Sequence, residues 1–326
     1  MADVICMGEV LVEFVSTQAN TPLTQAPGFI KAPGGAPANV AVALQRLGTP
    51  AAFVSKVGND PFGVYLRDSL AADGIDTRYL FVDPQARTTA VFVAVWDDGR
   101  KDLCFYRNPG ADMMLREDEI DARIFEGARC FHFGSITFIH EPAAAAQRKA
   151  LRIAQQKGLM ITYDPNYRPT LWPNVETAQR VIRDSFRHCH LAKISAEEWE
   201  VATGHAELEA GIRAVLDWGV ELLVVSQGSK GALATNGDYW IELPAIPVDV
   251  VETTGAGDGF MAAMLSRLLP ERERLGSLRK VDESVVRQAL AYAVAVGGLT
   301  CTKPGAIPAL PTRAEVEAFL QARGLR

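Results

Sequence analysis

One carboxylate in the sequence stands within a segment that is otherwise suited to binding anions. Asp258 directly follows Gly255, Ala256 and Gly257, and the apolar segment 261–269 comes after it. Small residues let backbone N–H groups approach a phosphate closely, and the N-terminus of a helix attracts negative charge. A carboxylate would repel such a ligand, so its presence suggests a base that accepts the proton of an attacking hydroxyl group. The spacing also fits a simpler hypothesis, a glycine turn in which Asp258 only caps the helix.

Short apolar runs alternate with amphipathic segments along most of the chain. In the first amphipathic segment Val40, Ala43, Leu44 and Leu47 recur at the spacing of one helix face. Such alternation is typical of βαβ units and predicts an α/β fold with a parallel sheet. The expected strands are 4–7, 51–54, 159–163 and 221–225, and the expected helices are 37–47, 62–70 and 261–269.

One segment departs from this alternation. The runs 88–96 and 101–106 are rich in strand-forming residues and flank the turn residues 97–100, so they predict a hairpin. Together with extended segments at 13–15 and 28–32, the hairpin could form a small sheet that projects from the α/β body as a lid.

Composition and charge restrict the classes of function. With 33 basic and 39 acidic side chains the net charge is -6, and no basic block is present, so nucleic acid is not an expected partner. The five cysteines show no C-x-x-C spacing, which indicates thiols in a reducing compartment. Acidic residues interrupt the first apolar stretch, unlike a signal peptide, and the longest uncharged run is too short to span a bilayer. A cytoplasmic protein without a membrane partner is expected.

Several ordered motifs resemble those of the ribokinase-like, or PfkB-type, carbohydrate kinases, and in particular their fructokinase branch. The stretch T-T-G-A-G-D-G-F at 253–260 is similar to the C-terminal signature of that family. The resemblance implies one ribokinase-like domain over 1–326, with a doubly wound, mostly parallel sheet, helices on both faces, and a β-sheet lid formed by about 12–33 and 86–112. It also implies an ATP-dependent sugar kinase. Further matching motifs lie at 34–39, 56–63, 164–166 and 226–231.

The resemblance also implies roles for residues on the sugar side. Asp258 would be the general base, and the amides of 255–258 would form an anion hole. Glu13 stands where relatives usually carry an aspartate that faces the sugar, and Arg107 resembles a lid residue that touches it. The implied sugar-binding residues are Glu13, Gly34, Gly35, Asn39, Arg107 and Arg168.

On the nucleotide side the resemblance implies ATP and Mg²⁺. Glu198 would hold Mg²⁺ through water, because it matches the acidic residue of a family motif in which Ser195 replaces the usual asparagine. Glu252, Thr254 and Gly305 are candidate ligands of a monovalent cation such as K⁺, although Glu252 replaces an aspartate and Ala309 a serine. The implied ATP-binding residues are Lys193, Ser195, Ser226, Gly228 and Gly231.

The run 105–113 resembles the fructokinase lid, so D-fructose with D-fructose 6-phosphate as product is the preferred substrate. Kinases of 2-keto-3-deoxygluconate or of aminoimidazole riboside stay open, because the branch that the motifs resemble contains both. Arg107 and Arg168 could pair with the carboxylate of the acid sugar, 2-keto-3-deoxygluconate. A sugar- or nucleotide-binding regulator without activity is a more distant alternative. A dinucleotide-dependent dehydrogenase is disfavoured because no G-x-G-x-x-G follows the first strand. The resemblance further implies a homodimer that forms through the lid.

Overall fold

A mostly parallel sheet forms the centre of the molecule. The structure, a computed structural model, describes residues 2–96 and 100–325. All neighbouring strands of the sheet are parallel except at β12, which is antiparallel to both of its neighbours. The parallel sheet expected from the sequence is therefore confirmed. In spatial order the strands are β13 (Trp240–Leu243), β12 (Ala232–Thr235), β11 (Leu222–Ser226), β10 (Leu191–Ser195), β9 (Met160–Asp164), β8 (Cys130–Gly134), β1 (Val4–Met7), β4 (Ala51–Gly58) and β5 (Leu80–Asp83).

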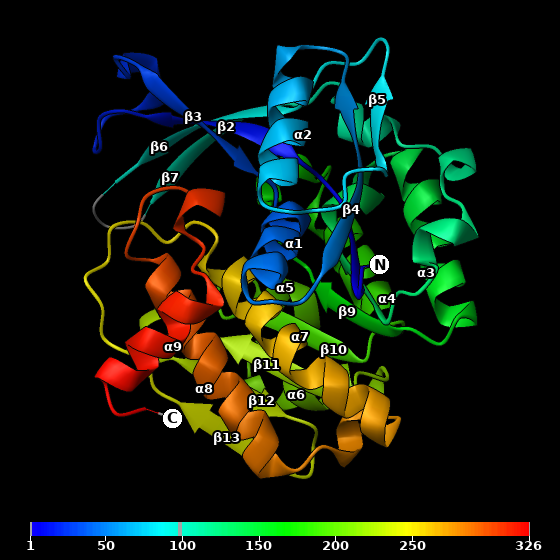
Figure 1. Cartoon of the computed structure of the whole chain (residues 1–326), viewed down its shortest axis with the longest axis vertical. Helices are drawn as coiled ribbons and strands as arrows, with labels where there is room; N and C mark the ends of the chain where they lie inside the picture. The colour runs from blue at the N-terminus through cyan, green and yellow to red at the C-terminus, as the bar shows by residue number, and fades with distance from the viewer. Residues whose placement is uncertain (1, 97–99, 326) are drawn as a thin grey trace.

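Helices cover both faces of this sheet (Figure 1). Alternate residues of β1 point to opposite sides: Val4 and Cys6 belong to one apolar cluster, and Ile5 and Met7 belong to the other. The first cluster includes residues of α1 (Ala36–Arg46), α2 (Pro61–Ala72), α7 (Ala256–Leu275), α8 (Glu283–Thr300) and α9 (Arg313–Ala322). The second includes residues of α3 (Ala143–Gln156), α4 (Val175–Phe186), α5 (Trp199–Thr203) and α6 (Leu208–Asp217).

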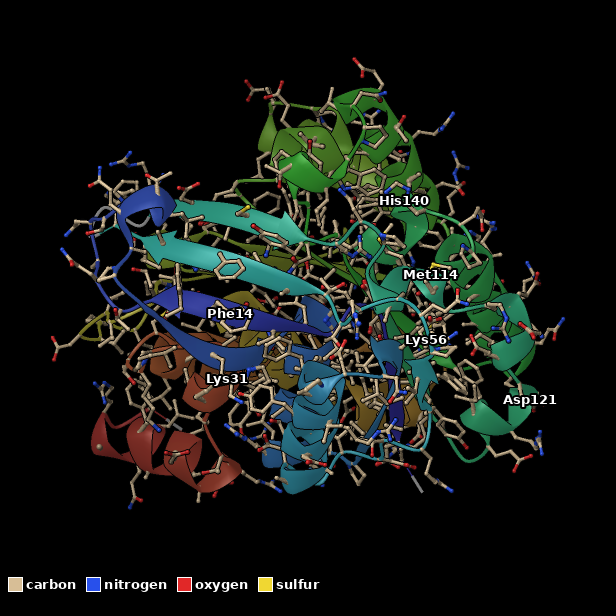
Figure 2. The ribbon with its side chains drawn as sticks, turned by 90° about the horizontal axis from the view of Figure 1, so that it is seen from above. Phe14, Lys31, Lys56, Met114, Asp121 and His140 are labelled. Carbon is tan, nitrogen blue, oxygen red and sulfur yellow. The ribbon has the colours of Figure 1, made fainter. Side chains whose placement is uncertain are left out.

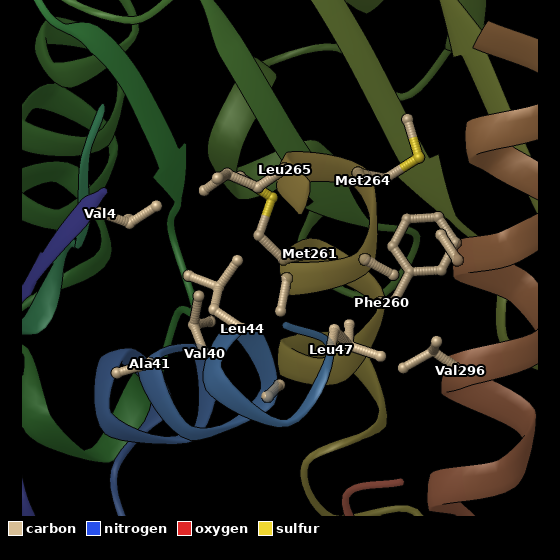
Figure 3. Packing of buried hydrophobic residues seen from close by; sticks show 14 of the residues in the cluster. Val4, Val40, Ala41, Leu44, Leu47, Phe260, Met261, Met264, Leu265 and Val296 are labelled. Atoms are coloured by element: carbon tan, nitrogen blue, oxygen red, sulfur yellow. The ribbon is translucent and has the colours of Figure 1, made fainter. Parts of the chain in front are cut away.

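Helix α1 packs against α7 at the centre of the first cluster. Figure 3 shows Val40 and Leu44 of α1 close to Met261 and Leu265 of α7. These four side chains are at most 1% exposed, so the helix face expected from the spacing is buried, as are all residues of α1 from 37 to 44. This contact fixes the start of α7 relative to β1, which precedes α1 in the chain.

Helix α7 begins earlier than the apolar pattern predicts. Its N-cap is Gly255 with φ 80°, and the helix runs from Ala256 to Leu275 instead of covering only 261–269. A Cβ atom on Gly255 would also lie 3.1 Å from Cα of Ala306, so glycine suits both the backbone angle and the space. Asp258 therefore lies inside the first turn of the helix and not in a loop before it.

A second, smaller sheet stands beside the first. Its order is β3 (Phe29–Gly34), β2 (Leu11–Ser16), β6 (Ala90–Val95) and β7 (Lys101–Tyr106), and β6 and β7 are antiparallel, as the expected hairpin requires. Residues 97–99 of the expected turn lie outside the described residues. Figure 2 shows this sheet projecting from the body, with Phe14 on β2 and Lys31 on β3.

The order of the strands reverses at β1, which lies between β4 and β8. In doubly wound sheets ligands bind outside the carboxyl ends of the strands at such a point. The loops that follow β1, β8, β9 and β10 and the first turn of α7 meet at this edge. Among the described helices, none is both long and apolar enough to cross a lipid bilayer.

Candidate active site

A cavity of about 500 Å³ lies at the carboxyl ends of the strands. Its walls come from the small sheet on one side, and from the ends of β9 and β10 and the start of α7 on the other. The structure thus brings together residues that are far apart in the sequence. The predicted residues on its walls are Glu13, Gly35, Asn39, Arg107, Arg168, Lys193, Ser195, Glu198, Glu252, Thr254, Gly255, Gly257 and Asp258.

The other predicted residues are not part of these walls. Ser226 ends β11 directly beside Ser195 of β10, and Gly228 and Gly231 belong to the turn that follows β11. This turn extends the edge of the sheet on the side where the sequence places the nucleotide. The predicted residues outside the walls are Gly34, Ala256, Ser226, Gly228, Gly231 and Gly305.

Asp258 is 6% exposed and makes two hydrogen bonds to side-chain amides. Asn39 Nδ2 donates to Asp258 Oδ2 at 2.8 Å, and Asn166 Nδ2 donates to Oδ1 at 3.4 Å. The carboxylate thus faces the cavity, and Gly255 takes the N-cap position that the simpler hypothesis gave to Asp258. Burial, with help from the charge of Asp164, raises the pKa of Asp258 to about 6.

A buried ion pair lies directly below the glycine turn. Lys193 Nζ is 2.9 Å from Asp164 Oδ2, and both side chains are at most 5% exposed. A Cβ atom on Gly257 would lie 3.0 Å from the Lys193 ammonium, so the positive charge stands against the backbone of the turn. Burial opposes this charge, but the carboxylates of Asp164 and Glu198 outweigh it and raise the pKa of Lys193. The cation is therefore present at neutral pH.

Glu198 is a buried carboxylate that organises two loops. Its Oε1 accepts from the backbone N–H of Ser195 at 2.8 Å, and its Oε2 accepts from that of Tyr167 at 2.9 Å. In the described part of the chain no three His, Cys, Asp or Glu side chains are grouped as a metal cage. Mg²⁺ keeps several waters and is usually held by one or two carboxylates plus phosphate oxygens. The carboxylate of Glu198 on the cavity wall fits that mode of binding.

On the sugar side two glycines stand where a side chain would collide with neighbouring groups. Gly35 has φ 113°, and a Cβ atom there would lie 2.4 Å from the carbonyl oxygen of Glu9. A Cβ atom on Gly34 would lie 2.6 Å from Glu13 Oε1, so the glycine leaves the space that the Glu13 carboxylate occupies. Burial raises the pKa of Glu13 to about 7, against the attraction of Lys101. The carboxyl group of Glu13 can therefore change its charge near neutral pH.

Arg107 is buried, and its guanidinium is already paired. Arg107 Nε donates to Asp112 Oδ2 at 2.8 Å, and Thr89 donates its hydroxyl to the other oxygen of Asp112. Arg168 also lines the cavity, and its guanidinium donates to the carbonyl oxygen of Tyr167 at 3.1 Å. The two arginines thus differ, since only Arg107 is held by a carboxylate.

The candidate ligands of a monovalent cation are bonded to one another. Thr254 donates its hydroxyl to Glu252 Oε1, and the backbone N–H of Gly305 donates to Glu252 Oε2 at 2.7 Å. Lys101 of β7 donates to the hydroxyl oxygen of Thr254, and its Nζ lies 4.0 Å from Glu252 Oε1. Burial lowers the pKa of Lys101, although Glu252 and Glu13 oppose the shift.

Five functional candidates were missed from the sequence. Asp164 and Asn166 belong to the matching motif at 164–166, which directly follows an expected strand, but they were assigned no role in the site. The other three gave no such signal, since their neighbours do not differ from those of ordinary loop and strand residues. The missed residues are Glu9, Lys101, Asp112, Asp164 and Asn166.

Comparisons with known proteins agree with this architecture. The model of the pfkB family carbohydrate kinases matches residues 1–313. The chain belongs to the pfkB family of carbohydrate kinases. It is 42% identical to the probable fructokinase-4 of Arabidopsis thaliana over 320 residues, which cover 98% of this chain and 96% of that protein.

Two solved structures of related proteins share the fold of this chain. A fructokinase with bound ATP from Xylella fastidiosa superposes with a TM-score of 0.90 at 31% identity, over 99% of this chain and 100% of that one. A fructokinase double mutant from Vibrio cholerae O395, with fructose, ADP and a potassium ion bound, superposes with a TM-score of 0.87 at 31% identity, over 98% of both chains. The doubly wound fold with helices on both faces is thereby confirmed.

The acid side of the pH profile should report Asp258. A kinase base must be unprotonated, so kcat/KM for the sugar should fall about tenfold per pH unit below the pKa of Asp258. That pKa is about 6, because burial and the charge of Asp164 raise it. The variant Asp164→Asn removes this charge and frees Lys193, so the acid limb should move to lower pH.

Glu13→Gln is the matched control, because Glu13 also titrates in the cavity; its acid limb should stay in place. If the acid limb of the kcat/KM profile stays in place in Asp164→Asn but disappears in Glu13→Gln, the titrating group is Glu13 and not Asp258.

Proposed function

We propose that this chain is an ATP-dependent fructokinase that transfers the γ-phosphoryl group of ATP to the 6-hydroxyl of D-fructose. The observation that carries the proposal is Asp258, a buried carboxylate with a raised pKa in the first turn of α7, directly beside the glycine turn. The fructokinase names of the relatives support the choice of fructose. A regulator without activity would have no use for a base at this position.

In this proposal Asp258 accepts the proton of the 6-hydroxyl as that oxygen attacks the γ-phosphorus. The backbone N–H groups of 255–258 stabilise the charge that develops on the transferred group, and the positive end of α7 adds to their field. Asn39 fixes one carboxylate oxygen through its amide nitrogen. Its Oδ1 is buried without a partner among the described residues, so it can accept a hydrogen bond from a sugar hydroxyl.

ATP would lie along the ends of β10 and β11. Lys193 and Ser195 line the cavity, and Ser226, Gly228 and Gly231 continue that edge toward the nucleotide. Mg²⁺ would be held by Glu198 through water, where it neutralises phosphate charge when ATP is bound. The proposal of Mg²⁺ as the metal is supported by the position of Glu198 on the cavity wall.

Sugar hydroxyls would be held by Gly35 and Asn39, with Glu13 of the small sheet and Arg168 after β9 on the walls around them. Arg107 is bound by Asp112, so its charge is largely satisfied within the protein. An acid sugar such as 2-keto-3-deoxygluconate would need a guanidinium that is free to pair with its carboxylate. Of the two arginines only Arg168 meets that need, so the choice of a neutral sugar rests on the fructokinase relatives.

We further propose that 1–326 form one domain and that 12–33 and 86–112 act as a lid over the sugar. Residues of β2, β6 and β7 form one wall of the cavity, so movement of this sheet would expel water that could otherwise accept the phosphoryl group.

The cytoplasm is the proposed compartment, because the five cysteines are free thiols. Cell fractionation tests this proposal.

Replacing Asp258 by Asn should lower kcat by about 10²-fold or more, as expected when a general base is removed. The substitution keeps the size of the side chain, so the Kd values of ATP and fructose should change little. Steady-state kinetics and titration calorimetry measure the two quantities. Turnover close to that of the parent protein would exclude Asp258 as the base.

Fructose should be the best substrate. Under equal ATP and Mg²⁺ concentrations, kcat/KM for D-fructose should exceed that for 2-keto-3-deoxygluconate and for aminoimidazole riboside by about tenfold or more, the discrimination that one or two hydrogen bonds supply. Coupled ADP release measures all three. A higher kcat/KM for either competitor would contradict fructose as the substrate but would leave the assignment as a sugar kinase intact. No turnover with any of the three sugars would contradict the proposed function.

A homodimer should form through the outer face of the lid. Phe14, Phe29, Phe92 and Tyr106 stack on this face, and Tyr106 is 65% exposed. Exposed aromatic groups of this kind mark association surfaces. Sedimentation at micromolar concentration should give a dimer that Tyr106→Glu dissociates, whereas Val175→Glu on α4 should not. A monomeric parent protein would refute this interface.

A further inference from the structure

The ammonium group of Lys101 lies beneath the glycine turn, although Lys101 belongs to the small sheet. It contacts Thr254 through a hydrogen bond, and it lies 4.0 Å from Glu252 Oε1. Burial raises the pKa of the nearby Cys301 thiol and the charge of Lys101 opposes this rise, while the backbone oxygen of Cys301 accepts from the backbone N–H of Glu252. The contact therefore joins β7 to the backbone that enters α7.

While Lys101 is in place, the groups around its ammonium do not favour a bound monovalent cation. Glu252 accepts hydrogen bonds from Thr254 and from the backbone of Gly305, so fewer of its lone pairs are left for a cation. Ala309, in the loop after Gly305, has no hydroxyl that could act as a ligand. A cation here would also stand against the positive charge of Lys101.

We propose that the ammonium group of Lys101 supplies the positive charge that a bound K⁺ would otherwise supply beneath the glycine turn. An ordinary surface ion pair would contribute little, because water screens it. Lys101 differs from such pairs, since its side chain is 25% exposed, that of Glu252 is 9% exposed, and Lys101 lines the catalytic cavity. In a site with little water a fixed charge acts strongly on neighbouring groups.

The charge would have two effects on the turn. Together with Lys193 below Gly257, it would favour phosphate oxygens at the amides of 255–258. Because Lys101 is fixed to β7, the charge would reach the turn only when the small sheet lies against it. Lys101 is thus a positioning residue that couples the lid to the anion hole, which a freely bound ion cannot do.

The inference rests on the proposed function and is tested by comparing K⁺ with choline at constant ionic strength. The parent protein should phosphorylate fructose at rates that agree within about twofold in the two salts. Lys101→Met should lose about tenfold or more in kcat in choline and regain much of it in K⁺, whereas Lys101→Arg, which keeps the charge, should stay independent of K⁺. Lys31→Met is the control, since Lys31 packs on the Tyr65 ring and lies outside the cavity (Figure 2).

Two measurements do not depend on turnover. K⁺ should raise the Tm of Lys101→Met by about 2 °C or more relative to choline, because an ion that binds only the folded state stabilises it, and it should leave the parent Tm unchanged. Hydrogen exchange of 253–257 should be faster in Lys101→Met than in the parent protein or in Lys31→Met.

Each result that contradicts the inference differs from a failure of the proposed function. The inference would be overturned if the parent protein phosphorylates fructose with a kcat that is about tenfold or more higher in K⁺ than in choline. It would also be overturned by a Lys101→Met variant that keeps its full rate in choline, or by one that shows no K⁺-specific gain in rate and Tm. A parent protein that phosphorylates no sugar would contradict the proposed function, and the Tm comparison would still test the role of Lys101.

Discussion

The buried charge of Asp258 is the constraint on which the rest of the site depends. A carboxylate that is almost fully desolvated keeps its proton unless positive groups and hydrogen-bond donors compensate for burial. Here the amides of Asn39 and Asn166 bind its oxygens, and the Lys193 ammonium lies below the same turn. The negative charge of Asp164 adds to the effect of burial, and the pKa of Asp258 is about 6. The result is a group that is charged at neutral pH and still basic enough to accept a proton.

The packing of the two sheets serves this arrangement. Contact between α1 and α7 in the core holds Asn39 against Asp258, because both side chains extend from the first turns of these helices. The end of β10 places Lys193 opposite Asp164 of β9. The small sheet closes the remaining side, and Arg107, which follows β7, lies on the cavity wall with its charge paired to Asp112.

Much of the fold could be predicted from the sequence, because the signals are local. The helix at 36–46 follows from the spacing of Val40 to Leu47, and the glycine run before Asp258 indicated an anion-binding turn. The start of α7 at Ala256 was missed, since the alanine and the two glycines around Asp258 carry no apolar pattern. Contacts between distant residues gave no signal either: Asn39 and Asp258 are 219 positions apart, and Lys101 and Thr254 are 153 apart. Such pairs are set by strand order, which no local pattern contains.

The central claim is that Asp258 receives the proton of the sugar hydroxyl that is phosphorylated above the 255–258 amides. A crystal structure with D-fructose and an unreactive ATP analogue tests this most directly. The account predicts the 6-hydroxyl oxygen within hydrogen-bonding distance of an Asp258 carboxylate oxygen, in line with the γ-phosphorus. A structure in which the 6-hydroxyl bonds to another residue, or in which the γ-phosphate lies away from the glycine turn, would contradict it.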